Sequence, residues 1–96
     1  MIKFELKNNA YMIGATELPT EILLQYPHEI EGDEGEITLP YEVGDKVTYY
    51  PSTLERAALQ NGAQKVISEF TVFGGHLCCR FEGSNVPYSI DCVSPI

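Results

Sequence analysis

The first residues of the chain alternate between apolar and charged side chains. Ile2, Phe4 and Leu6 are separated by single charged residues, which is the spacing of a strand with one buried face. Residues 8–9 are both asparagine and favour a tight turn, and residues 11–13 are apolar enough to pair back onto the first strand. The pattern therefore predicts an N-terminal β-hairpin.

The segment after this hairpin is less regular. Residues 20–25 are apolar enough for a short helix or for a buried strand. A capping threonine, Thr20, and a terminating proline, Pro27, favour the helix. Residues 27–36 read PHEIEGDEGE and combine a proline and two glycines with five acidic side chains. This segment has few apolar side chains to bury and several turn-forming residues, and it is therefore predicted to be a loop.

The second half of the chain opens with a clearer signal. Residues 46–50 alternate as a strand does, and Pro51 ends that strand because it has no backbone N–H to donate. In residues 52–62, Ser52 and Glu55 have the spacing of a capping box, and apolar residues follow at helical intervals. These residues therefore predict a two-turn helix.

The remaining residues predict an antiparallel meander. Residues 65–73 and 76–81 are strand-like, and the glycines at 74–75 suit a tight hairpin turn between them. Shorter strands are expected at 86–90 and 93–96. The side chains expected on the buried faces of the two longer strands are Val66, Phe70, Val72, Leu77, Cys79 and Phe81.

The order of these strands resembles that of SH3-like small β-barrels. Residues 43–49 read VGDKVTY and carry the Gly-Asp-x-Val pattern that opens such a domain. A variable loop, a three-stranded meander, a tight turn and a short closing strand then follow, with residues 52–62 as a helical insertion in the loop. The resemblance covers residues 43–96 and implies a barrel that binds peptides, proteins or nucleic acid through aromatic residues at one rim.

The predicted fold is thus mostly β, of the α+β class. It consists of a small SH3-like antiparallel barrel at 43–96, an N-terminal β-hairpin and one or two short helices. A chain of 96 residues has the length of a single domain, so we expect one domain over 1–96. Its N-terminal part, residues 1–42, is acidic and lies outside the SH3-like resemblance.

Negative charge is concentrated in one segment. The chain carries 14 acidic and 6 basic residues, for a net charge of −8. No lysine or arginine lies between Lys7 and Lys46, whereas nine acidic residues do, so the rest of the chain is nearly neutral. This distribution predicts one charged face. It disfavours direct binding to nucleic acid, because a phosphate backbone requires a basic footprint.

The acidic run at residues 29–36 has three interpretations. Its acids alternate in part as calcium ligands do, but the run is too short for an EF-hand loop and has no flanking helices. It can be a solvated loop, as most charge runs are. It can also be a recognition surface for a basic partner protein. The candidate partner-binding carboxylates are Glu29, Glu31, Asp33, Glu34 and Glu36.

The aromatic residues divide between core and surface. Tyr49 and Tyr88 fall on apolar strand faces and are expected in the core. Tyr41 and Tyr50 fall on the opposite side, where aromatic residues often mark a binding surface. Together with Phe73 they are the predicted aromatic contacts for a partner, and a core position is the alternative for each of the tyrosines.

Three cysteines, at 78, 79 and 92, indicate a reducing compartment, since small secreted domains usually carry larger even sets. His76, Cys78 and Cys92 are an alternative zinc set, but the usual Cys-x-x-Cys spacing is missing and Cys79 points to the opposite face of its strand. A nucleophilic pair of His76 and Cys78 would need a cleft and an oriented base, for which no motif is visible. Buried structural thiols are the simpler interpretation, with no metal or cofactor.

These observations favour a non-enzymatic protein-binding module. The alternative is a small acidic inhibitor, of the kind encoded by phages and mobile elements, that mimics nucleic acid and blocks a basic groove on a host protein. No run of eighteen apolar residues and no signal-peptide pattern is present, so we expect a cytoplasmic protein without a membrane anchor. The oligomeric state stays open.

Overall fold

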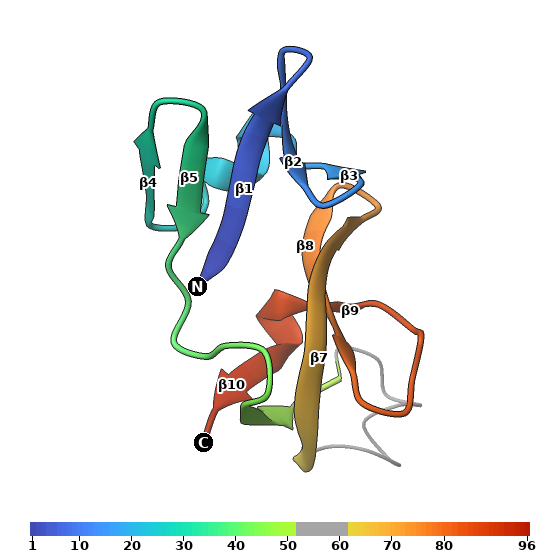
Figure 1. The fold of residues 1–96 in the computed structure, drawn as a ribbon. Helices are drawn as coiled ribbons and strands as arrows, with labels where there is room; N and C mark the ends of the chain where they lie inside the picture. Colours follow the sequence, from blue (N-terminus) through green and yellow to red (C-terminus); the bar gives the residue numbers. More distant parts are fainter. Residues whose placement is uncertain (52–61) are drawn as a thin grey trace.

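The structure is a computed structural model that describes residues 1–51 and 62–96, and these residues form two five-stranded antiparallel sheets (Figure 1). The N-terminal sheet has the order β3-β2-β1-β5-β4 and the C-terminal sheet the order β10-β6-β7-β8-β9. The prediction of a mostly-β fold is confirmed. The strands are β1 (Ile2–Lys7), β2 (Ala10–Ile13), β3 (Thr16–Glu17), β4 (His28–Glu31), β5 (Glu34–Ile37), β6 (Lys46–Tyr49), β7 (Ala63–Phe73), β8 (His76–Phe81), β9 (Tyr88–Ser89) and β10 (Val93–Pro95).

The predicted N-terminal hairpin is present. β1 pairs with β2 up to Lys7 opposite Ala10, and the two asparagines between them form the turn. Asn8 and Asn9 have φ values of 51° and 66°, a left-handed conformation that asparagine tolerates better than most residues. The local sequence therefore encodes this hairpin directly.

The prediction of a loop at residues 27–36 is wrong, because these residues form the hairpin of β4 and β5. A two-residue turn joins the strands, with Gly32 in the left-handed region at φ 62°. β5 also pairs along its length with β1, placing Ile37 opposite Ile2. The ladder to β1 supplies hydrogen bonds and a buried partner that the acidic segment lacks by itself, so tertiary pairing overrides its weak strand propensity.

Gly35 allows β5 to lie against the core. It is the one glycine of the chain outside the positive-φ region, so backbone conformation does not explain it. A Cβ at this position would lie 2.3 Å from the ring of Phe4, opposite it on β1, and 2.9 Å from the carbonyl oxygen of Glu29. The Phe4 ring is 3% exposed and packs edge-on against Tyr11 with centroids 5.3 Å apart, so it has little room to move.

The first predicted helix is present as one turn, α1 (Thr20–Leu23), which buries Ile22 and Leu23. Its N-cap is Pro19, with no side-chain cap hydrogen bond, so the prediction that Thr20 caps the helix is wrong. The proline is already extended at φ −61° and leaves Thr20 as the first helical residue. The second predicted helix, at 52–62, falls almost entirely outside the described residues.

The β7–β8 hairpin is present as predicted, with glycines 74 and 75 at φ 60° and 77° in its turn. The predicted inward face of β8 is also confirmed, since all three of its members are buried. On β7, however, a register shift between Ile67 and Glu69 changes which side chains face inward. Ile67 is 1% exposed, and it replaces Val66 in the core.

The five strands of the C-terminal sheet do not close into a barrel within the described part of the chain, since β10 and β9 remain its two edges. β9 has only two residues before the chain enters a 3-10 turn, η1 (Ile90–Cys92). This strand is too short to extend the pairing toward β10. The buried cluster draws side chains from both sheets and from α1, and no described helix is long and apolar enough to cross a membrane.

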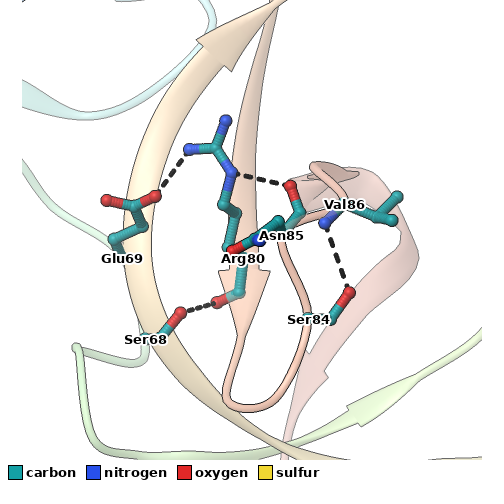
Figure 2. Close-up of polar contacts among 6 residues, drawn as sticks. All are labelled: Ser68, Glu69, Arg80, Ser84, Asn85 and Val86. Atoms are coloured by element: carbon teal, nitrogen blue, oxygen red, sulfur yellow. Dashed lines mark hydrogen bonds and ion pairs between the residues drawn. The ribbon is translucent and has the colours of Figure 1, made fainter.

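Polar contacts around Arg80 hold the segment between β8 and β9 (Figure 2). The Arg80 Nη1 donates to Glu69 Oε1 at 2.6 Å, and its Nε donates to the carbonyl oxygen of Asn85 at 3.0 Å. Ser68 Oγ donates to the carbonyl of Arg80, which ties the same strand to β7 beside the bulge. One cation thus joins β7, β8 and the following turn, a role that sequence analysis did not assign to it.

Substituting Gly35 by alanine should lower the free energy of unfolding by about 1–3 kcal/mol, because the new Cβ overlaps the Phe4 ring. Urea denaturation of the parent and of Gly35→Ala measures the difference. In a Phe4→Leu background the same substitution should cost clearly less, since the obstructing ring atoms are gone. An equal loss in both backgrounds would contradict the proposed contact.

Candidate functional site

The outer face of the N-terminal sheet carries two rows of directly opposed side chains. One row runs from Glu29 on β4 through Glu36 on β5 to Lys3 on β1. The second row crosses all five strands and consists of Glu31, Glu34, Glu5, Met12 and Glu17. The six carboxylates of these rows, from Glu5, Glu17, Glu29, Glu31, Glu34 and Glu36, are called the acidic face below.

The acidic face follows from the pleat of the strands. Successive side chains of a strand point to opposite sides, and residues opposed across neighbouring strands point to the same side. On β1, Ile2 and Phe4 point into the core, so Lys3 and Glu5 point outward. All six carboxylates are exposed except Glu36, which is half-buried.

Two lysines of β1 partly offset this charge. Lys7 Nζ lies 2.8 Å from Glu5 Oε1, with both side chains about half exposed. Lys3 stands opposite Glu36 in the first row. An exposed ion pair of this kind contributes little, because water screens it and two long side chains must be ordered. Six carboxylates against two ammonium groups leave the face strongly negative.

An open groove of about 930 Å³ runs over β1, β4 and β5. Four glutamates of the acidic face line it from the β4–β5 hairpin, at positions 29, 31, 34 and 36. Met12, from the second row, adds apolar surface to the same groove. Ile30 also borders the groove, but its side chain is on the opposite side of β4, where it is 45% exposed. The groove therefore combines negative charge with a small apolar area at Met12, which suits a partner bearing mainly basic side chains.

The remaining acidic residues of the N-terminal part lie elsewhere. Asp33 is in the turn between β4 and β5, where its carbonyl oxygen accepts a hydrogen bond from the Leu6 N–H at 2.6 Å. Glu21 is in the first turn of α1. Glu42 and Asp45 stand before β6, where Asp45 Oδ2 accepts a hydrogen bond from the Glu42 N–H. The structure thus brings four of the five predicted carboxylates onto one face and places Asp33 at its tip.

The predicted aromatic contacts are not brought together. Tyr41 is 4% exposed and stacks on Phe70, so the prediction of a surface position is wrong. Only its side chain enters the core, since Pro40 and Glu42 on either side of it are exposed. Tyr50 and Phe73 are 49% and 64% exposed. They lie beside opposite ends of the eleven-residue β7, a separation on the order of 30 Å.

Tyr49 has the core position that its strand face predicted, and Tyr88 is half-buried and packs against the core. Tyr49 is 2% exposed, and its ring centroid lies 4.9 Å from that of Tyr88. Phe81 completes the cluster at 5.8 Å from Tyr49 and 5.1 Å from Tyr88. These aromatic rings hold the C-terminal sheet together, with Tyr49 and Phe81 buried and Tyr88 half-buried.

The alternative zinc set is not assembled in residues 1–51 and 62–96, where no three His, Cys, Asp or Glu side chains are grouped to hold a metal ion. Cys78 is buried, and its Sγ donates to the carbonyl oxygen of His76 at 3.5 Å. Burial raises the pKa of the Cys78 thiol, and it raises that of Cys79 to about 12. A nucleophilic cysteine needs the opposite shift, so this geometry favours structural thiols.

No protein-family profile, curated protein or solved structure matches this chain.

Removing one charge from the middle of the acidic face should stabilise the fold. Glu34 is opposed by Glu31 on one side and by Glu5 on the other. We expect Glu34→Gln to raise the free energy of unfolding by about 0.5 kcal/mol at low salt, because like charges opposed across strands repel. Urea denaturation should show this gain shrink toward zero in about 1 M salt, where the screening length is about 3 Å.

The control is Glu82→Gln, at an exposed position after β8, which should change the free energy of unfolding little. A gain that persists in high salt would contradict the electrostatic cause.

The buried Tyr41 should make stability fall at high pH. Burial is the main cause that raises the pKa of Tyr41 to about 12, from an ordinary value of 10.0. The folded protein holds this proton after the unfolded chain has lost it, so the contribution is complete below pH 10 and is lost between pH 10 and 12. Tyr41→Phe should therefore lose less stability than the parent over that range in urea titrations. The exposed Tyr50→Phe is the control, and it should follow the parent. Equal pH dependence in Tyr41→Phe and the parent would show that Tyr41 does not titrate in this way.

Proposed function

We propose that this protein is a non-enzymatic protein-binding module whose acidic face docks on a basic surface of a partner protein. The observation that carries the proposal is the cross-strand register, which collects six carboxylates from four strands on one exposed side of the N-terminal sheet. A complementary basic surface would meet them together. Such complementarity accelerates association and selects among partners.

The energetics of the unbound protein support the same function. Glu29 opposes Glu36, and Glu31 opposes Glu34, which in turn opposes Glu5. Each such pair of like charges destabilises a sheet by about 0.2–1 kcal/mol. The fold therefore keeps an arrangement that costs stability, and a bound cationic partner would relieve the repulsion.

We further propose that residues 43–96 are an SH3-like unit. The strand order β10-β6-β7-β8-β9 supports this, since the closing strand pairs with the opening strand and a meander occupies the other side. The opening strand follows Gly44, at φ 93°, and the closing strand follows the 3-10 turn η1. In this proposal the C-terminal sheet is the scaffold, and the acidic face belongs to the N-terminal addition.

The absence of catalysis and of a cofactor is part of the proposal. The perturbed thiols are buried and shifted toward their neutral forms, which is unfavourable for nucleophilic chemistry. Three free cysteines support a reducing compartment such as the cytoplasm. The net charge of −8 opposes direct contact with a nucleic-acid backbone.

A second candidate function is that of a nucleic-acid mimic. The two regular rows of carboxylates on one side of a sheet favour it, because they present closely spaced negative charges as a phosphate backbone does. In that case the partner is a nucleic-acid-binding protein, and the chain is a small inhibitor of the kind that phages and mobile elements encode.

The test is affinity capture from host lysate with the immobilised parent and two charge-matched variants. The triple variant Glu29→Gln, Glu31→Gln, Glu34→Gln should lose basic partners that the parent retains at low salt, because it removes half of the acidic face. The control carries Glu21→Gln, Glu42→Gln and Glu82→Gln, an equal change of charge outside that face, and should retain the partners. Mass spectrometry identifies the captured proteins. Capture of the same proteins by both variants would exclude docking through the acidic face.

Competition separates the two candidate functions. Adding double-stranded DNA or RNA to the captured complex should release the partner if the protein occupies a nucleic-acid-binding groove, since both ligands then require the same basic side chains. A complex that survives competition but dissociates in high salt supports the general protein-binding function instead.

A further inference from the structure

The N-terminal sheet ends in an edge strand, β4, which pairs on one side with β5 and on the other with no described strand (Figure 1). Among the edges of the two described sheets, β3 and β9 have two residues each. β10 ends in Pro95, which has no backbone N–H. β4 has four residues and contains no proline. It is therefore the described edge with the most backbone groups to offer.

The register shows which backbone groups of β4 face outward. The Thr38 N–H donates to the Pro27 carbonyl at 2.8 Å. Pro27 and Thr38 are therefore a hydrogen-bonded pair, and they directly precede the first pair of the β4–β5 ladder, His28 and Ile37. Bonded and non-bonded pairs alternate along an antiparallel ladder. His28 and Ile30 are therefore in non-bonded pairs with β5, and their N–H and C=O groups point toward the open side of the sheet.

The side chains of β4 define what would fit beside it. Glu29 and Glu31 lie on the acidic face, with Glu36 and Glu34 behind them on β5. Ile30 lies on the opposite side of the strand and is 45% exposed. An added strand with basic residues on one side and apolar residues on the other would match both sides of this edge.

A second copy of this chain is a poor occupant. If two β4 strands paired through the backbone groups of His28 and Ile30, the glutamates of one copy would lie opposite the glutamates of the other. The reason is that alternate residues of a strand point to the same face of the sheet. Like charges in that position repel, which is a common way in which proteins protect edge strands from self-association. The charge of this edge thus disfavours pairing with a second copy of β4 and favours pairing with a cationic strand.

We propose that the edge of β4 binds an extended, lysine- or arginine-bearing segment of a partner protein as a sixth strand of the N-terminal sheet. The outward groups of His28 and Ile30 supply the main-chain hydrogen bonds, and Glu29 and Glu31 select basic side chains at alternate positions. This inference rests on the proposed function, because it specifies how a basic partner meets the acidic face.

The probe is a capped peptide, Thr-Lys-Val-Lys-Val-Lys-Thr, titrated into the full chain, with the same peptide carrying glutamates for lysines as a control. On binding, amide hydrogen exchange measured by NMR should slow at least about tenfold at His28 and Ile30, because these N–H groups gain partners. The glutamate peptide should leave both amides unchanged. Binding of both peptides alike would overturn the selection for basic strands.

A proline at position 30 tests the hydrogen bonds separately from the charge. The N–H of Ile30 faces away from β5, so Ile30→Pro removes an edge donor and leaves the β4–β5 ladder and all carboxylates in place. It should weaken peptide binding about tenfold, whereas Ile30→Val should bind within about twofold of the parent. Circular dichroism checks the fold of each variant. If Ile30→Pro does not fold, amide exchange in the parent decides the question.

The remaining outcomes separate this inference from the proposed function. If Glu29→Gln with Glu31→Gln abolishes peptide binding and Ile30→Pro binds normally, strand addition is excluded and docking through the acidic face stands. If no lysine peptide binds, strand addition is excluded, and the capture experiment still tests the proposed function. Slow exchange at His28 and Ile30 that depends on protein concentration alone would identify a second copy as the occupant and overturn the proposal.

Discussion

The pairing of β5 with β1 is the interaction on which the N-terminal half depends. β1 is the central strand of its sheet, and it pairs with β2 on one side and with β5 on the other. The β1–β2 hairpin forms through a local asparagine turn, whereas the acidic β4–β5 hairpin is attached through a ladder between residues about thirty positions apart. Without that ladder the acidic segment would have neither a buried face nor a fixed direction for its carboxylates.

Close approach at Gly35 makes this ladder possible. The Phe4 ring occupies the space in which any other residue would place its Cβ, and Ile37 is fully buried opposite Ile2. The same contact keeps the inner side of β5 flat against the core and directs Glu34 and Glu36 outward. Packing on one side of the sheet therefore determines the electrostatics of the other.

The two sheets have different roles in the proposed function. The C-terminal sheet packs Tyr49, Phe81 and Tyr88 against one another, and its exposed aromatic side chains, Tyr50 and Phe73, lie too far apart to form one binding rim. The N-terminal sheet exposes its charge beside the edge of β4, and the two together suit an extended cationic segment. In the proposed function the first is a scaffold and the second is the recognition surface.

Local sequence was sufficient for the strands that carry their own signals. Alternation in β1 and β8, the asparagine turn at 8–9 and the glycine turn at 74–75 are properties of a few neighbouring residues, and each was predicted correctly. The concentration of negative charge between Lys7 and Lys46 was likewise visible in the order of the residues alone. Only the tertiary structure decided that residues 28–37 are a hairpin, that a bulge exchanges Val66 for Ile67, and that Tyr41 is buried. Each of these features depends on residues elsewhere in the chain: the hairpin on the ladder to β1, the bulge on pairing with β8, and the burial of Tyr41 on packing against Phe70. The residues next to each feature in the sequence carry no signal for it.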